Sequence, residues 1–267
     1  MGVRKGKEKM EFPRDDLLEK YVHLYEQWVV PYSPDFDVED GATRYIKFND
    51  AWRGLNPFGK FLLPRLTNRK NTFPQKTSDK LSKNANPANY VTLRYDKDGN
   101  LKTARIGEKG VDDLVFVYVS RQLTIGYHVN FTQGRAVKYD FYNFEWYEYD
   151  DDGRLISAEE FQGYGNPEDD VIINCEYYEY DGNVLSRAQC FKEFQKYPIE
   201  ATIKMVKQMV PDRIFNPDQF EYSFQRVEDG LDYICNHYYR ESQTITDSDH
   251  ISEETLTHLA KNGLRLI

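Results

Sequence analysis

The stretch Glu145-Trp146-Tyr147-Glu148-Tyr149-Asp150 decides the fold, because it returns later in the chain as Glu176-Tyr177-Tyr178-Glu179-Tyr180-Asp181. Five of the six positions are identical, and the sixth exchanges one large aromatic residue for another. Alternating aromatic residues, then Asp and Gly, then another alternating run predict a strand, a turn and a strand in each copy. The residues that follow also recur in order: Leu155, Ala158 and Phe161 after the first copy, and Leu185, Ala188 and Phe191 after the second.

Side chains alternate between the two faces of a strand, which assigns the repeated residues to opposite sides. Glu145, Tyr147 and Tyr149 share one face of the first copy, as Glu176, Tyr178 and Tyr180 do in the second, whereas Trp146, Glu148 and Asp150 and their counterparts lie on the other face. We expect the tyrosine-bearing face to be a tyrosine ladder in the core, closed by Leu155 and Leu185. The other face presents rows of carboxylates beside large rings. The residues assigned to partner binding are Glu145, Trp146, Glu148, Asp150, Glu176, Tyr177, Glu179 and Asp181.

Further alternating runs flank the two copies and predict an antiparallel β-meander of repeated Tyr-rich hairpins. They begin at Tyr90 and include residues 114–119, 123–130 and 136–144, and a later hairpin is expected over 219–240. The 21 tyrosines favour sheet over helix, because aromatic rings pack well on a pleated surface. Together with the helices described next, the pattern predicts an α+β fold.

Three helices are expected to pack on one face of this sheet. The first follows Pro13 and stops at Pro31, the second lies between Pro198 and Pro211, and the last is capped by Ser252. Residues 31–55 are expected to be irregular. The predicted organisation is an N-terminal helix with a basic irregular segment (1–89), a hairpin repeat domain (90–197) and a helix-hairpin-helix portion packed on the sheet (198–267).

The net charge of −9 conceals a strong asymmetry along the chain. The segment from Arg53 to Lys83 carries a net charge of +7, whereas the segment from Asp140 to Asp181 carries −13. The three cysteines are far apart, so neither a zinc cluster nor a disulfide framework is indicated. The charged N-terminus runs into no apolar segment, and no run approaches the length of a membrane span. We therefore expect a cytoplasmic protein.

The basic segment leaves three interpretations open. It forms a surface loop, it lies against the acidic sheet, or it binds nucleic acid through residues 53–83. In the third case, basic side chains contact phosphates and an aromatic ring stacks on bases. The residues assigned to this alternative are Arg65, Arg69, Lys70, Lys76 and Phe73.

No catalytic or metal-binding motif stands out in the sequence. Asp96-Lys97-Asp98-Gly99-Asn100 begins like a calcium loop, but Gly107 occupies the twelfth position, where a bidentate glutamate is needed. A turn is therefore predicted there. No P-loop, GxGxxG, GxSxG or HExxH occurs. No metal or cofactor is expected, and an enzyme with an unrecognised site is the third functional hypothesis.

The run from Tyr147 to Leu155 resembles the YxYDxxGRL signature of the YD repeats in RHS-type proteins. Tyr95 to Leu101 is similar to a partial copy, and Tyr180 to Leu185 to a copy shortened by one residue. The resemblance covers at most residues 90–193. The spacing of about 31 residues is longer than the usual YD period, and the dozens of repeats that build an RHS cage are lacking. The resemblance implies β-hairpins and kinship with toxin-associated or surface-recognition proteins, without catalytic residues.

The leading hypothesis is a non-catalytic protein-binding module whose acidic, aromatic sheet docks a basic partner protein. Opposite charge speeds the encounter and the rings supply binding hot spots. Immunity proteins against basic nuclease toxins follow this electrostatic logic, as would a regulatory accessory protein. The alternative is a nucleic-acid-associated accessory subunit of a defence or mobile-element system. The strand carboxylates also have a purely structural interpretation, in which they keep the sheet edges soluble.

Overall fold

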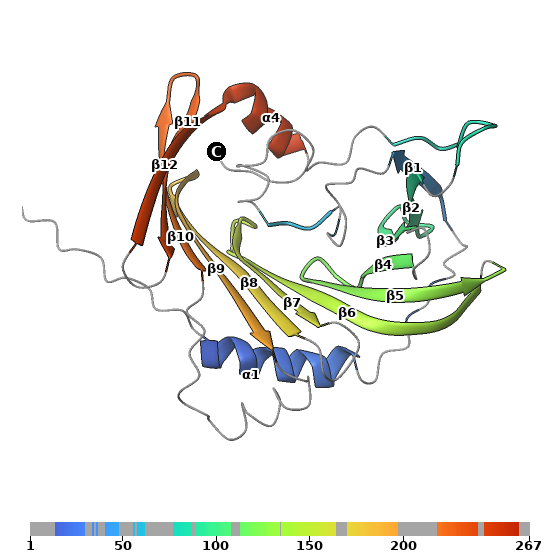
Figure 1. The fold of residues 1–267 in the computed structure, drawn as a ribbon. Coiled ribbons are helices and arrows are strands. Elements are labelled where there is room, and N and C mark those ends of the chain that lie inside the picture. The colour runs from blue at the N-terminus through green and yellow to red at the C-terminus, as the bar shows by residue number, and fades with distance from the viewer. Residues whose placement is uncertain are drawn as a thin grey trace, which may run out of the picture.

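One antiparallel sheet of twelve strands makes up most of the protein, which is therefore mainly β (Figure 1). The computed structural model describes residues 14–29, 34, 36, 41–47, 56, 58–61, 77–86, 89–107, 113–133, 135–163, 170–196, 218–239 and 243–261. Each strand pairs with its neighbour in sequence, so the sheet is a meander without crossovers. The strands are β1 (Thr43–Lys47), β2 (Tyr90–Tyr95), β3 (Leu101–Ile106), β4 (Asp113–Tyr118), β5 (Leu123–Thr132), β6 (Arg135–Tyr149), β7 (Leu155–Gly163), β8 (Asp170–Asp181), β9 (Val184–Lys196), β10 (Asp218–Val227), β11 (Gly230–Tyr239) and β12 (Gln243–Ser252).

Helices occupy the two ends of the described chain. α1 (Arg14–Leu24) continues into a π-helical turn, η1 (Tyr25–Val29), and α4 (Glu253–Lys261) follows β12. The Ser252 side chain accepts a hydrogen bond from the backbone N–H of Thr255 at 3.4 Å, which is the predicted N-cap. The helix predicted between Pro198 and Pro211 lies outside the described residues.

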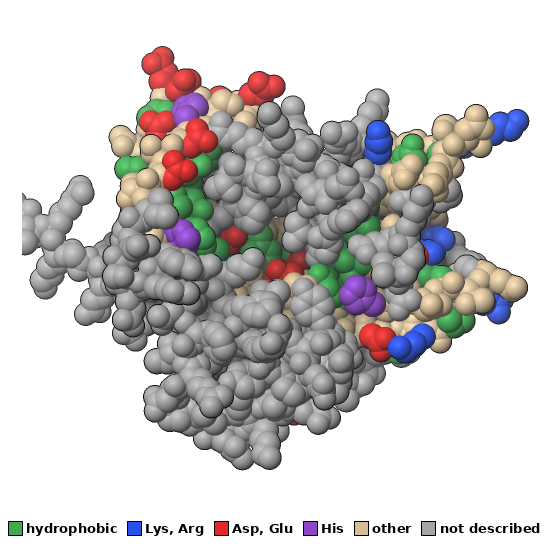
Figure 2. All heavy atoms as spheres, viewed as in Figure 1, with side chains coloured by type: hydrophobic (Ala, Val, Ile, Leu, Met, Phe, Trp, Pro, Cys, Tyr) green, Lys and Arg blue, Asp and Glu red, His purple; other side chains and the backbone are tan. Residues whose placement is uncertain are grey.

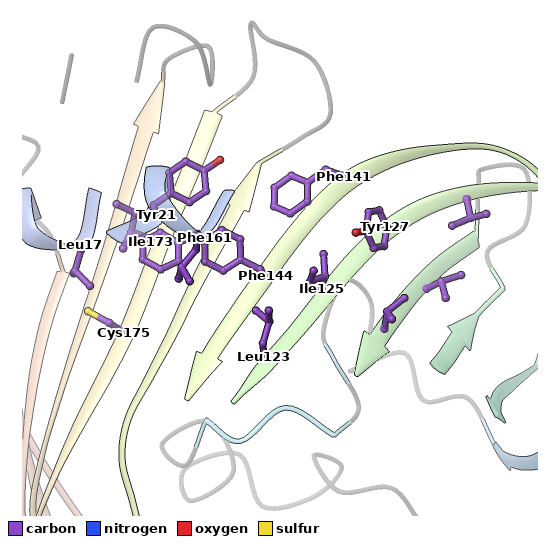
Figure 3. Close-up of a cluster of buried hydrophobic side chains, with 14 of the residues drawn as sticks. Leu17, Tyr21, Leu123, Ile125, Tyr127, Phe141, Phe144, Phe161, Ile173 and Cys175 are labelled. Carbon is purple, nitrogen blue, oxygen red and sulfur yellow. The ribbon is translucent and has the colours of Figure 1, made fainter. Parts of the chain in front are cut away.

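The sheet curls into an open trough, and α1 lies against its convex side (Figure 1). Leu17, Tyr21 and Leu24 of α1 are buried in a cluster with side chains of β4 to β9. The Tyr21 ring stacks on Phe144 and Phe161, with centroids 5.4 and 5.2 Å away (Figure 3). Aromatic stacking of this kind adds to the apolar area that the helix removes from water.

The concave side of the trough holds the tyrosine ladder. Tyr147 and Tyr178 are buried there with Leu155 and Leu185, as predicted. Leu256 of α4 belongs to the same cluster. The two described helices therefore contact opposite faces of the sheet, not the single face that was predicted. The reason is that both faces are apolar along the middle strands, so each face needs its own cover.

Two strands extend the sheet beyond the prediction. β1 lies in the segment 31–55 that was predicted to be irregular, and its Ile46 is buried against β2. β12 pairs with β11 over ten residues and buries Ile251 against Leu231. As a result, the three predicted parts of the chain contribute strands to a single sheet.

Five turns of the meander lie at the same end of the trough, because alternate connections of antiparallel strands fall at the same end. These turns join β2–β3, β4–β5, β6–β7, β8–β9 and β10–β11. Gly99, Gly153 and Gly182 adopt φ values of 82°, 76° and 58° in three of them. This left-handed conformation favours glycine and explains the Asp-Gly pattern of the sequence.

Candidate partner-binding site

Glu145 and Glu176, the first residues of the duplicated hexapeptides, are buried in the structure. Their exposed fractions are 3% and 1%. Each lies on the concave face with the tyrosine two positions later, and the hydroxyl of Tyr147 or Tyr178 donates a hydrogen bond to its carboxylate. Burial, followed by the charge of Glu145, raises the pKa of Tyr147 well above its usual value. These two carboxylates are therefore internal acceptors and do not form an exposed acidic row.

A short segment of chain is bound across the first of these carboxylates. The side-chain amide of Asn56 donates to Glu145 Oε2 at 2.8 Å, and the hydroxyl of Tyr118 donates to Asn56 Oδ1 at 2.6 Å. The backbone N–H of Lys60 donates to the Tyr147 hydroxyl at 3.2 Å. Glu145 thus anchors Asn56 directly, and Lys60 through Tyr147, on the concave face, which gives this carboxylate a structural role.

Lys60 lies beside two of the hexapeptide tyrosines. Its Nζ is 5.1 Å from the ring centroids of Tyr147 and Tyr149, and it donates to the backbone carbonyl of Arg121 at 2.9 Å. Burial and then the Arg121 charge lower the pKa of Lys60 to about 8, although Glu145 acts in the opposite direction. The Lys60 amine is therefore held by the Tyr147 and Tyr149 rings and the Arg121 carbonyl at the end of the tyrosine ladder.

Trp146, Glu148 and Tyr177 lie on the convex face, as the alternation predicted, but α1 occupies this surface. Lys20 Nζ lies 2.9 Å from Glu148 Oε1 and 2.5 Å from Glu159 Oε2. It is also 5.7 Å from the Trp146 ring. Partial burial alone raises the pKa of Glu148, but the hydrogen bond and charge of Lys20 outweigh it and lower that pKa. The protein's own lysine therefore neutralises the predicted acidic face.

Two further hexapeptide carboxylates, Glu179 and Asp150, are also paired. Glu179 lies 3.4 Å from Arg187, which also binds Glu221. Asp150 lies 2.7 Å from Arg154. The sequence prediction missed these arginines as partners because they come from later strands and turns. Cross-strand registers such as Glu179↔Arg187 become visible only once the sheet pairing is known.

Asp181, by contrast, is exposed, and it belongs to a group of turn residues that share this property. We call residues 150–154, 181–183 and 228–229 the acidic turns; they connect β6–β7, β8–β9 and β10–β11. Within the described part of the chain, no ion pair involves the carboxylates of Asp151, Asp181 or Glu228, and all three are exposed. The Asp229 side chain is 84% exposed. The signal in the sequence was the Asp-Gly turns themselves, of whose carboxylates only Asp150 and Asp181 were assigned to partner binding.

Charge is distributed unevenly across the sheet. The described residues from β1 to β5 (43–132) include ten Lys and Arg and four Asp and Glu. The described residues from β10 to α4 (218–261) include two Lys and Arg and nine Asp and Glu. In Figure 2 acidic side chains gather at the upper left, over the ends of β11 and β12, whereas Lys and Arg lie on the opposite side. Sequential pairing of the strands converts charge blocks in the sequence into a charge gradient in space.

The residues assigned to nucleic-acid binding lie outside the described residues. These are Arg65, Arg69, Lys70, Phe73 and Lys76. In the described residues, no group of three or more His, Cys, Asp or Glu side chains is placed to hold a metal ion. No helix in that part of the protein is long and apolar enough to cross a membrane. Comparison of the chain with protein-family models, curated proteins and solved structures gave no match.

Proposed function

We propose that the protein is a non-catalytic binding module that docks a basic partner protein through its acidic turns. The observation that carries this proposal is the contrast between two sets of carboxylates. The hexapeptide carboxylates other than Asp181 are buried or paired with Lys20, Arg154 or Arg187. Those of Asp151, Asp181 and Glu228 are exposed and have no ion pair among the described residues.

The geometry of the acidic turns suits a protein surface. Successive acidic turns belong to alternate hairpins, so they are two strand spacings apart, roughly 10 Å. A rigid sheet holds them at this interval, and exposed carboxylates without internal partners lose no existing ion pair when a Lys or Arg approaches. Long-range attraction then accelerates the encounter, with a strong dependence on salt. The sequence of the β6–β7 turn resembles the YD repeats of toxin-associated proteins, and this resemblance favours an immunity-type or accessory role.

The test is a capture experiment with a charge-reversed variant. Wild-type protein and the triple variant Asp151→Lys, Asp181→Lys, Glu228→Lys are immobilised and exposed to a lysate of the native host. A matched control carries Glu19→Lys, Asp79→Lys and Glu254→Lys, three exposed carboxylates outside the acidic turns. We expect a basic protein to be retained by the wild type and the control, to be lost from the triple variant, and to bind as a purified protein with salt-sensitive affinity.

Retention of the same protein by the triple variant would overturn the proposal. The eluates are also assayed for DNA and RNA. Salt-sensitive nucleic acid that is lost on Arg69→Ala with Lys70→Ala, but kept by the acidic-turn variant, would instead establish the accessory-subunit hypothesis.

A further inference from the structure

The first strands of the sheet have one face in the core and one face outside it. Side chains of β1 and β2 such as Ile46 and Leu93 are buried on one face, in a cluster with side chains of β3 and β4. The opposite face of β1 and β2 belongs to no core cluster of the described residues, and the cluster that contains α1 extends only to β4 there. We call the residues of this outer face the tyrosine–lysine face; they are Thr43, Tyr45, Lys47, Tyr90 and Thr92.

Strand register places two tyrosines and a lysine side by side on this face. Lys47 is paired with Tyr90 and Tyr45 with Thr92, and paired residues of antiparallel strands point to the same face. Tyr45 and Tyr90 are therefore diagonal neighbours, with a backbone separation of roughly 7–8 Å. Tyr45 also exchanges two backbone hydrogen bonds of 2.8 Å with Ser78, so the segment that follows Ser78 starts at the edge of the face.

The side chains of the tyrosine–lysine face are accessible. Tyr45 and Tyr90 are half-buried and Lys47 is exposed. Among the described residues, no ring contact, side-chain hydrogen bond or ion pair involves these three side chains. They differ in this respect from Tyr147 and Tyr178, whose rings lie in the core. The two outer rings therefore keep a flat surface on which a ligand can stack.

The charge around this face is positive even after ion pairs are taken into account. The described residues of 41–47, 77–86 and 89–107 include eight Lys and Arg and three Asp. Arg44, Lys102 and Arg105 are each paired with an aspartate. Lys47 and Lys80 are exposed, and neither takes part in an ion pair within the described part of the chain. These two lysines thus flank the tyrosines, one on the face and the other two residues after Ser78.

We propose that the tyrosine–lysine face binds single-stranded nucleic acid, with bases stacked on Tyr45 and Tyr90 and phosphates beside Lys47 and Lys80. Stacking on aromatic rings and attraction of phosphates to lysines are the two contributions from which single-strand binding is built. The bases of a duplex are already stacked on each other, so the rings favour a single strand. Between the rings the face carries Thr92, which adds a hydroxyl and not the apolar centre that protein interfaces bury.

The place of this face in the charge gradient also suits a polyanion. β1 to β3 lie on the side of the trough opposite β11 and β12 (Figure 1), and Lys and Arg gather on that side in Figure 2. The acidic C-terminal strands repel phosphates and attract basic proteins. Nucleic acid and the basic partner of the acidic turns are therefore directed to different sides of the sheet, and this second binding activity is independent of the first.

The test is fluorescence anisotropy of labelled oligo(dT) and oligo(U) strands of about twenty nucleotides with the full chain across a salt series. We expect both strands to bind more tightly than a DNA duplex of the same length. Tyr45→Thr with Tyr90→Thr keeps strand-forming residues but removes the rings, and should weaken binding about tenfold or more. The matched control, Tyr45→Phe with Tyr90→Phe, keeps the rings and should bind like the wild type.

The lysines are tested through the salt dependence. Lys47→Ala with Lys80→Ala should reduce the slope of log affinity against log salt by about 1.4, because each single-strand phosphate contact contributes about 0.7. Lys97→Ala, at an exposed lysine of the β2–β3 turn, should leave the slope unchanged. Photocrosslinking of an iodouracil-substituted strand to the wild type, mapped by mass spectrometry, should mark Tyr45 or Tyr90.

Four results would overturn the proposal: a wild type that binds neither strand, a polyglutamate peptide that displaces the strands as well as unlabelled oligo(dT) does, folded Thr variants that bind like the wild type, or crosslinks found only outside the face. Circular dichroism melting verifies that each variant is folded. The acidic-turn triple variant keeps the tyrosine–lysine face and should still crosslink there. Failure of partner docking and failure of nucleic-acid binding are therefore distinguished.

Discussion

The guanidinium of Arg154 lies 5.0 Å from the centre of the Tyr180 ring. The same group donates to the backbone carbonyl of Gly182 in the next acidic turn. Arg121 repeats the arrangement one hairpin earlier, 3.8 Å from the ring of Tyr149 and with a 2.8 Å hydrogen bond to the carbonyl of Gly153. Each arginine therefore fastens its own turn to the next one along the same end of the sheet.

Replacement of Arg154 by lysine should lower the melting temperature although the charge is kept. Only the planar guanidinium bonds Asp150 through two nitrogens, at 2.7 Å each, while also reaching Gly182. Thermal unfolding monitored by circular dichroism measures the change. Arg135→Lys, at an exposed arginine at the start of β6, is the control and should leave the melting temperature unchanged. Equal melting temperatures for both variants would contradict the fastening role.

Asn56→Leu should destabilise the fold by about 2–3 kcal/mol, because it removes an amide donor from the buried Glu145 carboxylate and an acceptor from Tyr118. Tyr118→Phe removes only one hydrogen bond of this group and should cost about 1 kcal/mol. Urea unfolding of both variants measures the difference in the free energy of unfolding. A smaller loss for Asn56→Leu than for Tyr118→Phe would show that residues 56–61 are not held through Glu145.

Lys20→Met should cost about 2 kcal/mol, because it leaves Glu159 buried beside Glu148 without a counter-charge. Burial already raises the pKa of Glu159 despite Lys20. Adding Glu159→Gln to the Lys20→Met variant should therefore recover much of the loss. A double-mutant cycle from denaturant unfolding measures the coupling between the two residues. If the losses in the free energy of unfolding from Lys20→Met and Glu159→Gln simply add, α1 is held by its apolar contacts alone.

His250 should make stability depend on pH near neutrality. Its Nδ1 lies 2.7 Å from Asp232 Oδ1, and this contact, followed by the nearby Asp229, raises the His250 pKa above 6.5 despite opposing desolvation. A raised pKa means that the stabilisation is complete below about pH 6.5 and is lost as pH rises through the folded-state value. Asp232→Asn should lower the His250 pKa, as measured by NMR titration of the imidazole. An unchanged titration curve would assign the shift to another group.

The alternation of side chains in the hexapeptides was sufficient to predict the meander and its tyrosine ladder. Tyr147 and Tyr178 lie in the core with Leu155 and Leu185 because a strand leaves no other choice of face. The side of the sheet that α1 covers could not be predicted in the same way. The apolar stripe of α1 fits any apolar surface, and only the structure shows that Tyr21 of this helix stacks on Phe144 and Phe161.

The exposure of the candidate site residues could not be predicted from the sequence. Whether a carboxylate on a sheet is available depends on residues that are distant in sequence, such as Lys20 for Glu148, which are 128 positions apart. Pairing of this kind has no local signature. Asp151 and Asp181 escape it because a tight turn projects beyond the strands, whereas Asp150 and Asp152 are paired with Arg154 of their own turn. The exposure of a turn carboxylate therefore depends on whether a basic residue lies in the same turn.

The strictly sequential strand order also sets the order of events during synthesis. Each strand finds its partner in the segment made just before it, so hairpin closure costs little loop entropy and can proceed as the chain leaves the ribosome. α1 is the exception. It is made first, yet the aromatic residues that hold Tyr21 are made more than a hundred residues later. The N-terminal helix must therefore wait for β6 and β7, and its docking completes a fold that otherwise assembles in the direction of translation.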